Sequence, residues 1–316
     1  MPLTPPPVPP PLPPPGEHGG DGPRLARALG LDPGAVLDLS LSLNPVAPDP
    51  TAVVARHAGA ARCYPDADEA TAALSAALGT DPARVVLTNG GAEAIALVAA
   101  ELGAGWVDEP EFSLYRRHLP SLRPGAPRWR SDPHNPSGTL APLGAEAEVW
   151  DEAFYPLATG RWTSGRADDG AVVLGSLTKL FACPGLRIGY VLAPDAGFAA
   201  RVRARQPRWA VNAIALAAVP DLLATADLPG WHRAVSRLRG QLVAVLARHG
   251  LPAAPSDANY VLVPGAAGLR DRLARHGVLV RDCSSFGLEA TVRIAVPDDD
   301  GIERVAAALA RLSSPP

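Results

Sequence analysis

Hydrophobic and polar residues follow two patterns that alternate along most of the chain. Runs of about 4–8 apolar and β-branched residues predict buried strands, whereas stretches with an apolar residue every three or four positions predict amphipathic helices. The longest helical stretch covers residues 231–249, with apolar side chains at Val235, Leu238, Leu242 and Leu246. Strands that alternate with helices predict an α/β fold.

The predicted elements fall into a larger and a smaller group. Strands are expected over residues 37–42, 84–88, 148–154 and 171–174, and again over 258–263, 278–281 and 292–296. Further helices are expected over residues 24–30 and 198–206, in a stretch that stops at Gly79, and after the turn at residues 89–91.

These groups suggest four segments. We expect a proline-rich, disordered tail over residues 1–21, because its composition cannot bury a core. An N-terminal arm (22–45), a large domain (46–210) and a small C-terminal α/β domain (211–316), which the arm joins, should follow.

Composition narrows the class of protein. The 316 residues are 47% hydrophobic and carry a formal net charge of -3. This charge, without a basic-aromatic motif, argues against a nucleic-acid partner, and no apolar run approaches the ~20 residues of a membrane helix. Cys63, Cys183 and Cys283 have neither metal-ligand nor small-disulfide spacing. We therefore expect a cytoplasmic protein with reduced thiols, no metal and no membrane contact.

Lys179 is the only lysine of the chain, although lysine and arginine together number 29. It follows the apolar run 171–174 and the hydroxyls of Ser176 and Thr178, and Arg187 comes soon after. A lysine amine can form a Schiff base, whereas an arginine cannot. The pattern favours amine chemistry at Lys179, with a surface lysine at a strand end as the alternative.

The segment Ser-Leu-Thr-Lys at residues 176–179, followed by Pro-Gly-Leu-Arg-Ile-Gly-Tyr at 184–190, closely resembles the cofactor-binding lysine segment of the pyridoxal-phosphate-dependent class I/II aminotransferase superfamily. In detail it resembles the branch of histidinol-phosphate aminotransferases and the threonine-phosphate decarboxylases of cobalamin synthesis. The motifs keep the family order from about residue 39 to 296. The resemblance implies a fold-type I enzyme with a mostly parallel, seven-stranded type of sheet in a shortened large domain. It also implies pyridoxal 5'-phosphate as cofactor and a homodimer with shared active sites.

A strand, a double glycine and a helix follow one another at residues 84–95. Glycines before a helix let backbone N–H groups face an anion, and the helix dipole adds to the attraction. The resemblance implies that this turn holds the cofactor phosphate. Taken alone, Tyr64 is a half-buried packing residue, but in relatives its phenol reaches the phosphate of the neighbouring subunit. The residues assigned to the phosphate are Gly91, Ala92 and Glu93 through their amides, with Ser176, Thr178, Arg187 and Tyr64.

Three further motifs resemble those that hold the cofactor ring. Asp151 corresponds to the carboxylate that keeps the pyridine nitrogen protonated, although two acids at a strand end also suit a metal or an acid/base pair. Asn135 corresponds to the amide donor to the phenolic oxygen. Phe112 corresponds to the aromatic ring stacked on the cofactor, with a core phenylalanine as the alternative. Phe154 stands where relatives often have a tyrosine.

The resemblance also implies residues that contact the substrate. Arg293 matches the arginine that pairs with the substrate carboxylate, unless it is an exposed arginine in a salt bridge. Asn44, before a proline, is expected beside the substrate or in a plain turn. The loop at residues 281–288 resembles one near the substrate in the decarboxylases. Gly175 stands where relatives commonly carry an arginine, which makes substrate or phosphate recognition different here.

We therefore predict an aminotransferase-type enzyme that acts on an amino-acid or amino-phosphate substrate through a Lys179 Schiff base. A decarboxylase of O-phosphothreonine-like substrates is the alternative, and a pyridoxal-phosphate-binding protein without catalysis is a further one. The gaps from Tyr115 to Asn135 and from Gly138 to Asp151 are shorter than relatives of this family normally have. This difference predicts a large domain with fewer elements.

Overall fold

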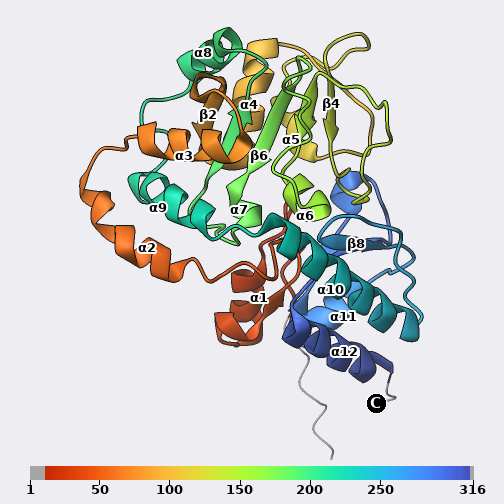
Figure 1. Cartoon of the computed structure of the whole chain (residues 1–316). Helices are drawn as coiled ribbons and strands as arrows, with labels where there is room; N and C mark the ends of the chain where they lie inside the picture. Colours follow the sequence, from red (N-terminus) through yellow and green to blue (C-terminus); the bar gives the residue numbers. More distant parts are fainter. Residues whose placement is uncertain (1–10, 314–316) are drawn as a thin grey trace, which may run out of the picture.

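The computed structural model describes residues 11–313. These residues form a larger unit around a six-stranded sheet and a smaller unit that carries the C-terminus. Figure 1 shows the larger unit above the smaller one. Helix α1 (Gly22–Leu29) lies with the smaller unit although it comes first in the sequence.

The sheet of the larger unit has the strand order β2-β7-β6-β5-β4-β3. Strands β3 to β6 pair in parallel, whereas β7 is antiparallel to both of its neighbours. The expected mostly parallel sheet is confirmed, with one strand fewer than the seven-stranded type. Residues 119–127 and 132–148 contain no helix, in agreement with the short gaps in the sequence. The strands are β2 (Val85–Thr88), β3 (Trp106–Val107), β4 (Arg128–Ser131), β5 (Val149–Asp151), β6 (Val172–Ser176) and β7 (Gly189–Leu192).

Successive residues of these strands pack into two different cores, because side chains alternate between the two faces of a sheet. Val86 and Val172 belong to one core, and Val85 and Val173 to the other. Both faces are therefore dry, which explains the continuous apolar runs in the sequence. Helices α4 (Gly90–Leu102), α5 (Ser113–His118) and α8 (Ala196–Arg205) pack on the first face, and α2 (Thr51–His57), α3 (Asp68–Leu78), α6 (Tyr155–Thr159) and α9 (Ala213–Ala224) on the second.

The smaller unit contains an antiparallel sheet in the order β10-β11-β8. Strand β1 (Leu37–Asp38) of the arm pairs in parallel with β9 (Val278–Leu279), so the arm is built into this unit. Its other elements are β8 (Tyr260–Val263), β10 (Arg281–Asp282), β11 (Val292–Ala295), α10 (Leu228–Arg248), α11 (Leu269–Ala274) and α12 (Asp299–Ser313). Short 3-10 helices lie at Pro33–Ala35, Ala58–Arg62, Pro82–Arg84 and Ser284–Phe286.

Helix α10 contributes to one core of the larger unit and to the core of the smaller unit. Trp231 and Val235 in its first half pack in the larger unit, whereas Leu238 and Leu242 pack in the smaller one. The core therefore changes within this helix, downstream of the boundary expected at residue 211. Helix α10 runs without a break from the larger unit into the smaller one.

The strand expected over residues 37–42 is shorter in the structure. Strand β1 ends at Asp38, whose carboxylate accepts hydrogen bonds from the Ser40 N–H at 3.0 Å and from the Gly22 N–H at 3.0 Å. An aspartate side chain that bonds the backbone two residues later forms a turn and competes with the strand. The residues after Asp38 therefore do not continue the strand pairing with β9, although they alternate between apolar and polar.

The segment before α1 lies against the smaller unit. The Pro13 carbonyl accepts a hydrogen bond from Arg270 at 2.9 Å, and the Glu17 carbonyl accepts one from Arg281 at 2.9 Å. The Gly20 N–H donates to the Ser40 hydroxyl at 2.8 Å. Residues 13–20 thus differ from the solvated tail that composition predicted, because buried arginines bind their carbonyls. The same prediction for residues 1–10 lies outside the described residues.

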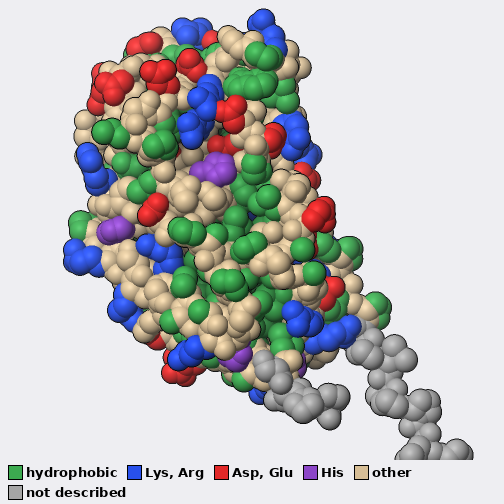
Figure 2. Space-filling view, turned by 90° about the vertical axis from the view of Figure 1, so that its right-hand side faces the viewer, with side chains coloured by type: hydrophobic (Ala, Val, Ile, Leu, Met, Phe, Trp, Pro, Cys, Tyr) green, Lys and Arg blue, Asp and Glu red, His purple; other side chains and the backbone are tan. Residues whose placement is uncertain are grey.

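Basic and acidic side chains are interspersed over the face shown in Figure 2. No single helix within residues 11–313 is long and apolar enough to cross a bilayer, and the one pair that passes together, α9 with α10, is bent by 84°. Among the same residues, no group of three or more His, Cys, Asp or Glu side chains is placed to hold a metal ion.

Candidate active site

A cavity of about 290 Å³ opens where strands β4, β5 and β6 end. Ligands of parallel sheets bind at this edge, outside the carboxyl ends of the strands. Residues of both units line it, together with His18 from the N-terminal segment. A larger hollow of about 580 Å³ beside Trp209 contains none of the predicted site residues. The predicted residues in the cavity are Gly91, Ala92, Phe112, Asn135, Asp151, Ser176, Thr178, Lys179, Arg187 and Arg293.

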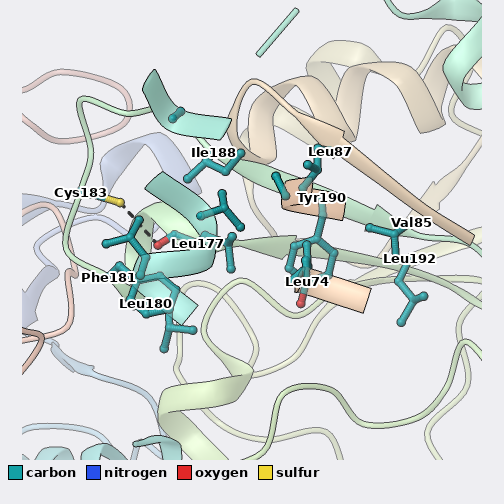
Figure 3. Close-up of a cluster of buried hydrophobic side chains, with 14 of the residues drawn as sticks. Leu74, Val85, Leu87, Leu177, Leu180, Phe181, Cys183, Ile188, Tyr190 and Leu192 are labelled. Carbon is teal, nitrogen blue, oxygen red and sulfur yellow. Dashed lines mark hydrogen bonds between the residues drawn. The ribbon is translucent and has the colours of Figure 1, made fainter. Parts of the chain in front are cut away.

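The sequence places Lys179 by anchoring the residues around it. Strand β6 passes directly into the short helix α7 (Leu177–Leu180), and Lys179 is the one basic residue of this single turn. Leu177, Leu180 and Phe181 belong to the same buried cluster as Tyr190, and Figure 3 shows them grouped near Cys183. Because these apolar neighbours fix α7, the lysine side chain is left to point at the cavity.

The Lys179 amine lies in an electropositive, half-buried setting. It donates a hydrogen bond to the Leu41 carbonyl at 2.9 Å. Burial, followed by the charges of Arg293, Arg187 and Arg281, lowers the pKa of Lys179 to about 8, against a weaker opposing effect of Asp38. An amine with this pKa is partly neutral near pH 7, which suits a nucleophile or a general base.

The turn between β2 and α4 is built for close approach. Gly90 has φ +77°, and a Cβ there would lie 2.6 Å from Nη2 of Arg187. A Cβ on Gly189 would lie 2.7 Å from the Gly91 nitrogen, so only glycine lets β7 pass behind this turn. The N-terminus of α4 and the exposed guanidinium of Arg187 consequently face the same corner of the cavity, which favours an anion there.

Two residues assigned to the phosphate have side chains engaged elsewhere. Thr178 donates its hydroxyl to the Ile188 carbonyl at 3.2 Å. Glu93 does not line the cavity, and its carboxylate accepts hydrogen bonds from the Asn89 N–H at 2.6 Å and from Gln206 at 3.0 Å. Thr178 therefore holds the segment that carries Arg187, and Glu93 caps the start of α4. Ser176 remains free to face an anion from the cavity wall.

Asp151 lies at the end of β5. Its carboxylate accepts hydrogen bonds from the Tyr115 phenol at 2.8 Å and from the Ala153 N–H at 3.0 Å. Burial raises the pKa of Asp151, and the two donors oppose that shift. A cation placed against this carboxylate would hold it ionised, as the pyridinium of the expected cofactor does.

Arg293 comes from β11 of the smaller unit and reaches Asn135 of the larger one. Its Nη1 donates to the Asn135 side-chain oxygen at 2.7 Å, and its guanidinium lies over the Tyr260 ring at 4.5 Å. The side chain is only 3% exposed, its Nε has no hydrogen-bond partner, and no ion pair within residues 11–313 includes it. The alternative of an exposed, salt-bridged arginine is therefore wrong.

Arg281, next to Arg293, is also buried and makes no ion pair within residues 11–313. It is 4% exposed, its Nε also lacks a partner, and its Nη2 donates only to the Glu17 carbonyl. Burial and the nearby charge of Arg293 lower the pKa of Arg281. The cavity thus contains two buried guanidinium groups for which the described chain supplies no carboxylate.

Aromatic rings close the cavity on two sides. Phe112 lines it as expected, with its ring edge-on to His18 at 5.7 Å and to Tyr115 at 5.9 Å. Phe154 packs edge-on to Tyr260 at 5.1 Å. Tyr260 is therefore the phenol on the side where Phe154 lacks one, but it donates to the His134 carbonyl at 3.1 Å.

Two predicted residues lie away from the cavity. The Asn44 side chain donates to the Leu180 carbonyl at 2.9 Å and accepts from the Val46 N–H at 3.1 Å. Asn44 thus holds α7 in place and does not line the cavity. Tyr64 is 78% exposed and packs on Trp209, with ring centroids 4.6 Å apart. It is not the half-buried packing residue that the sequence alone suggested.

Gly175 has a packing explanation. A Cβ there would lie 2.0 Å from the Tyr190 ring, which β7 places directly opposite in the antiparallel pair. Tyr190 is buried among Leu74, Leu87 and Leu192 (Figure 3). An arginine at position 175 would have to displace this ring, so the glycine follows from the large tyrosine on the neighbouring strand.

Three residues of the site region escaped the sequence analysis, namely His18, Glu111 and Ser131. His18 lies in a segment whose proline-rich composition predicted disorder. Glu111 is 3% exposed and binds Ser131 behind the cavity. The only sequence signal for Glu111 was its place beside Phe112, shortly before the helix α5. Acidic residues are common near the exposed starts of helices, so this signal did not indicate a buried site.

Solved structures show which class of protein has this fold. Histidinol-phosphate aminotransferase from Sinorhizobium meliloti, solved with pyridoxal-5'-phosphate, superposes with a TM-score of 0.80 at 21% identity, covering 92% of this chain and 95% of that one. L-threonine-O-3-phosphate decarboxylase from Porphyromonas gingivalis gives a TM-score of 0.73 at 23% identity, over 88% and 99%. The fold is therefore that of the fold-type I enzymes, as predicted.

Sequence comparison identifies the family. The family model for aminotransferase class I and II matches residues 131–309. Histidinol-phosphate aminotransferase from Halorubrum lacusprofundi is 30% identical over 90% of this chain and 91% of its own length. Threonine-phosphate decarboxylase from Salmonella typhimurium is 30% identical over 92% and 95%. The chain belongs to the aminotransferase class I and II family, and the predicted branch and aminotransferase-type enzyme are confirmed.

Proposed function

We propose that this enzyme uses pyridoxal 5'-phosphate to transform an amino acid or amino phosphate that carries two anionic groups. The observation that carries the proposal is the cavity around Lys179, where the buried Arg281 and Arg293 and the exposed Arg187 make no ion pair within the described chain. Buried charges of one sign are costly unless an opposite charge completes them. A phosphorylated cofactor and an anionic substrate together supply those charges.

The residues present fit this cofactor. The glycines beside Arg187 form a cradle that any Cβ would fill, which suits a phosphate held by backbone N–H groups and a guanidinium. Asp151 is a half-buried carboxylate suited to a ring nitrogen, and Asn135 and Phe112 line the same cavity. When bound, pyridoxal phosphate supplies an electron sink for cleaving a bond to the substrate Cα.

Each neighbouring residue then has a defined task. The Lys179 amine, neutral in part near pH 7, binds the cofactor aldehyde and afterwards takes or returns a proton at the substrate Cα. Arg293 holds the substrate carboxylate through its free Nε edge, while Asn135 fixes its other side. Asp151 keeps negative charge at the ring nitrogen, and the N-terminal segment with His18 limits the access of water.

The two buried arginines favour one alternative reaction as a second candidate. Arg281 lies beside Arg293 and offers a second anion site, so an O-phosphorylated amino acid would occupy both. Threonine-phosphate decarboxylation is therefore the alternative to transamination. Both reactions would use the same residues, and the orientation in which Arg281 and Arg293 hold the substrate would decide which bond to Cα is broken.

The cofactor is tested by loading the purified protein with pyridoxal phosphate. We expect a visible absorption band, and borohydride reduction should couple the cofactor to the peptide that contains Lys179, the only lysine. The Lys179→Ala variant should show neither. A wild-type protein without the band at saturating cofactor would overturn the proposal.

The reaction is tested on the loaded enzyme with two assays. Conversion of the cofactor to its amine form by amino donors would indicate transamination, and release of carbon dioxide from O-phosphothreonine would indicate decarboxylation. If neither occurs over a panel of amino acids and phosphorylated amino acids, the protein binds the cofactor without catalysis and the proposed reaction is wrong.

We also propose a homodimer in which Tyr64 reaches the phosphate site of its partner. Tyr64 and Trp209 are large aromatic side chains, 78% and 55% exposed, stacked on one another at the surface. Exposed aromatic pairs of this kind are enriched in protein interfaces.

Mixing two inactive variants tests the shared site. If Tyr64 serves the partner, a hybrid of Tyr64→Ala and Lys179→Ala chains contains one site with both native residues, and activity returns on mixing. If Tyr64 serves its own chain, no hybrid has a native site and activity stays absent. A monomer in sedimentation at assay concentration would also reject the dimer.

A further inference from the structure

Glu111 is a buried carboxyl group directly behind the wall of the cavity. It is 3% exposed, and no ion pair in the part of the chain that the structure describes includes it. It lines a separate outer hollow together with Ser131, and Ser131 also lines the active-site cavity. A single residue therefore separates Glu111 from the site.

Both hydrogen-bonding groups of Ser131 are directed at this carboxyl. The Ser131 N–H donates to Oε1 of Glu111 at 3.0 Å, and the Ser131 hydroxyl donates to Oε2. Burial raises the pKa of Glu111 to about 8, and the charge of Asp151 adds to this shift while the Ser131 donors oppose it. Near pH 7 the carboxyl is mostly neutral, so it adds little negative charge beside Asp151.

Ser131 passes this anchoring on to the residues of the site. Its Oγ accepts the backbone N–H of Asn135 at 2.7 Å, and the Asn135 side chain accepts Nη1 of Arg293 at 2.7 Å. A continuous series of hydrogen bonds thus connects Glu111 to Arg293, across the boundary between the two units. Buried polar groups connected in this way have fixed positions only when every member is satisfied.

A second branch leads to the carboxylate of the site. Tyr115 is fully buried, and the Ser131 side chain is one of the polar groups near its phenol. The same phenol donates to Asp151 at 2.8 Å. Ser131, fixed by Glu111, therefore contacts the supports of both Arg293 and Asp151.

We propose that Glu111 is a positioning residue, which fixes the Ser131 hydroxyl and through it orients Asn135 and Arg293 for the anionic group of the substrate. This inference rests on the proposed function, in which Arg293 binds a carboxylate. Side chains that touch a ligand keep a productive geometry only if the residues behind them are locked. Without the carboxyl group, the Ser131 N–H and the Ser131 hydroxyl both lose their hydrogen-bond partner, and the hydroxyl is free to turn away from the Asn135 N–H.

The inference is tested on the cofactor-loaded protein with succinate, a dicarboxylate that cannot react because it has no amine. Binding is measured by calorimetry, and kcat and KM for the amino substrate are measured in parallel. Glu111→Ala should weaken succinate binding about tenfold and raise KM more than it lowers kcat, the lower end of what an unpaired buried donor costs. Glu111→Gln should stay within about twofold of wild type, because an amide keeps both contacts to Ser131.

Controls separate this inference from the proposed function. Glu146→Gln changes an exposed glutamate and should bind succinate as wild type does. If Arg293→Ala also binds succinate normally, the proposed carboxylate site is wrong. If Arg293→Ala loses binding but Glu111→Ala keeps it, the role of Glu111 alone is overturned.

Two further outcomes keep the inference testable. Should Glu111→Ala not fold, Ser131→Ala removes the acceptor of the Asn135 N–H and should weaken succinate binding by the same factor; unchanged binding would overturn the inference. If Glu111→Gln binds succinate as poorly as Glu111→Ala, the ionisable group and not the position of Ser131 matters, and the positioning role is wrong.

Discussion

Two groups of buried charged side chains lie near strand β5, and only one of them has oppositely charged partners within the described chain. In the first, Arg166 pairs with Asp132 at 2.6 Å and with Glu152 at 3.6 Å, and its guanidinium lies 3.7 Å from the Trp150 ring. In the second, Arg281 and Arg293 lie beside Lys179 and make no ion pair within residues 11–313.

The difference separates a structural cluster from a binding site. Both acids of the first group are almost fully buried, and Thr163 and Ser164 satisfy the remaining oxygens of Glu152. Each charged group of this cluster has an ionic or hydrogen-bonding partner within the fold. The second group is balanced only when an anion enters, so the protein without ligand keeps a buried excess of positive charge. Variants of the two groups should therefore fail in different assays.

The largest effect is expected at Lys179. Lys179→Ala and Lys179→Arg should both lower kcat by roughly a thousandfold or more, because neither side chain supplies a neutral amine for covalent and proton-transfer steps. Steady-state rates at saturating cofactor measure the loss. An Arg variant with near-native rates would mean that only the charge of Lys179 matters.

Removing Arg166 should cost stability. Arg166→Leu leaves Asp132 and Glu152 buried without a cation, which should lower the free energy of unfolding by about 3 kcal/mol. Urea unfolding measures it. The matched control is Arg237→Leu, whose ion pair with Asp299 is exposed to solvent, so its removal should lower the free energy of unfolding far less. Equal losses in the two variants would contradict the comparison.

Arg293 should show the opposite behaviour. Arg293→Lys cannot pair with a carboxylate through two parallel hydrogen bonds, so kcat/KM should fall about thirtyfold, a loss of about 2 kcal/mol. Arg293→Leu removes a buried cation without a partner and should change the stability of the ligand-free protein by less than about 1 kcal/mol. A destabilisation as large as that of Arg166→Leu would show that Arg293 is a structural residue.

The pKa of about 8 for Lys179 predicts a pH dependence for the cofactor-free protein. Below about pH 8 the amine is protonated, so the initial rate of covalent attachment of pyridoxal phosphate should fall about tenfold per pH unit and level off above. Stability should rise with pH between about 8 and 10.5, because only the unfolded chain keeps the lysine proton there, and stay flat with respect to this group below 8. An attachment rate that still rises steeply above pH 9 would contradict the lowered pKa.

The smallest effect is expected at His18. Its ring lines the cavity at the edge of Phe112, and its contact with the Glu17 carboxylate is long, at 3.9 Å. His18→Ala should raise KM about threefold with little change in kcat, as for the loss of one neutral contact. His249→Ala, at the end of α10, is the control and should leave both constants unchanged.

Residues with a local pattern could be predicted from the sequence, and residues positioned by distant contacts could not. The strand that delivers Lys179, the glycine turn before α4 and the acid at the end of β5 all lie where apolar runs meet polar residues. Their arrangement at one edge of the sheet follows from parallel strands. The roles assigned to them from the resemblance stay predictions.

Other features depend on neighbours far away in the chain. Gly175 follows from a tyrosine on β7, and Asn44 is occupied by the carbonyl of Leu180. The role of Glu111 could not be predicted because its partner Ser131 lies on β4, 20 residues further along the chain. Strand β1 stopped early because Asp38 formed a turn that alternation alone does not reveal. The cytoplasmic location and the dimer also stay predictions.

The contact between the N-terminal segment and Arg281 has a consequence for genetic experiments. Arg281 is held by the main-chain carbonyl of Glu17, which every substitution at that position retains. An alanine at position 17 would therefore leave this contact in place. Shortening the gene to the start of α1, by contrast, would remove this cover while keeping each helix and strand described above. Such a truncated enzyme would fold yet turn over slowly, so an expression plan that trims the proline-rich start would risk discarding the right enzyme as inactive.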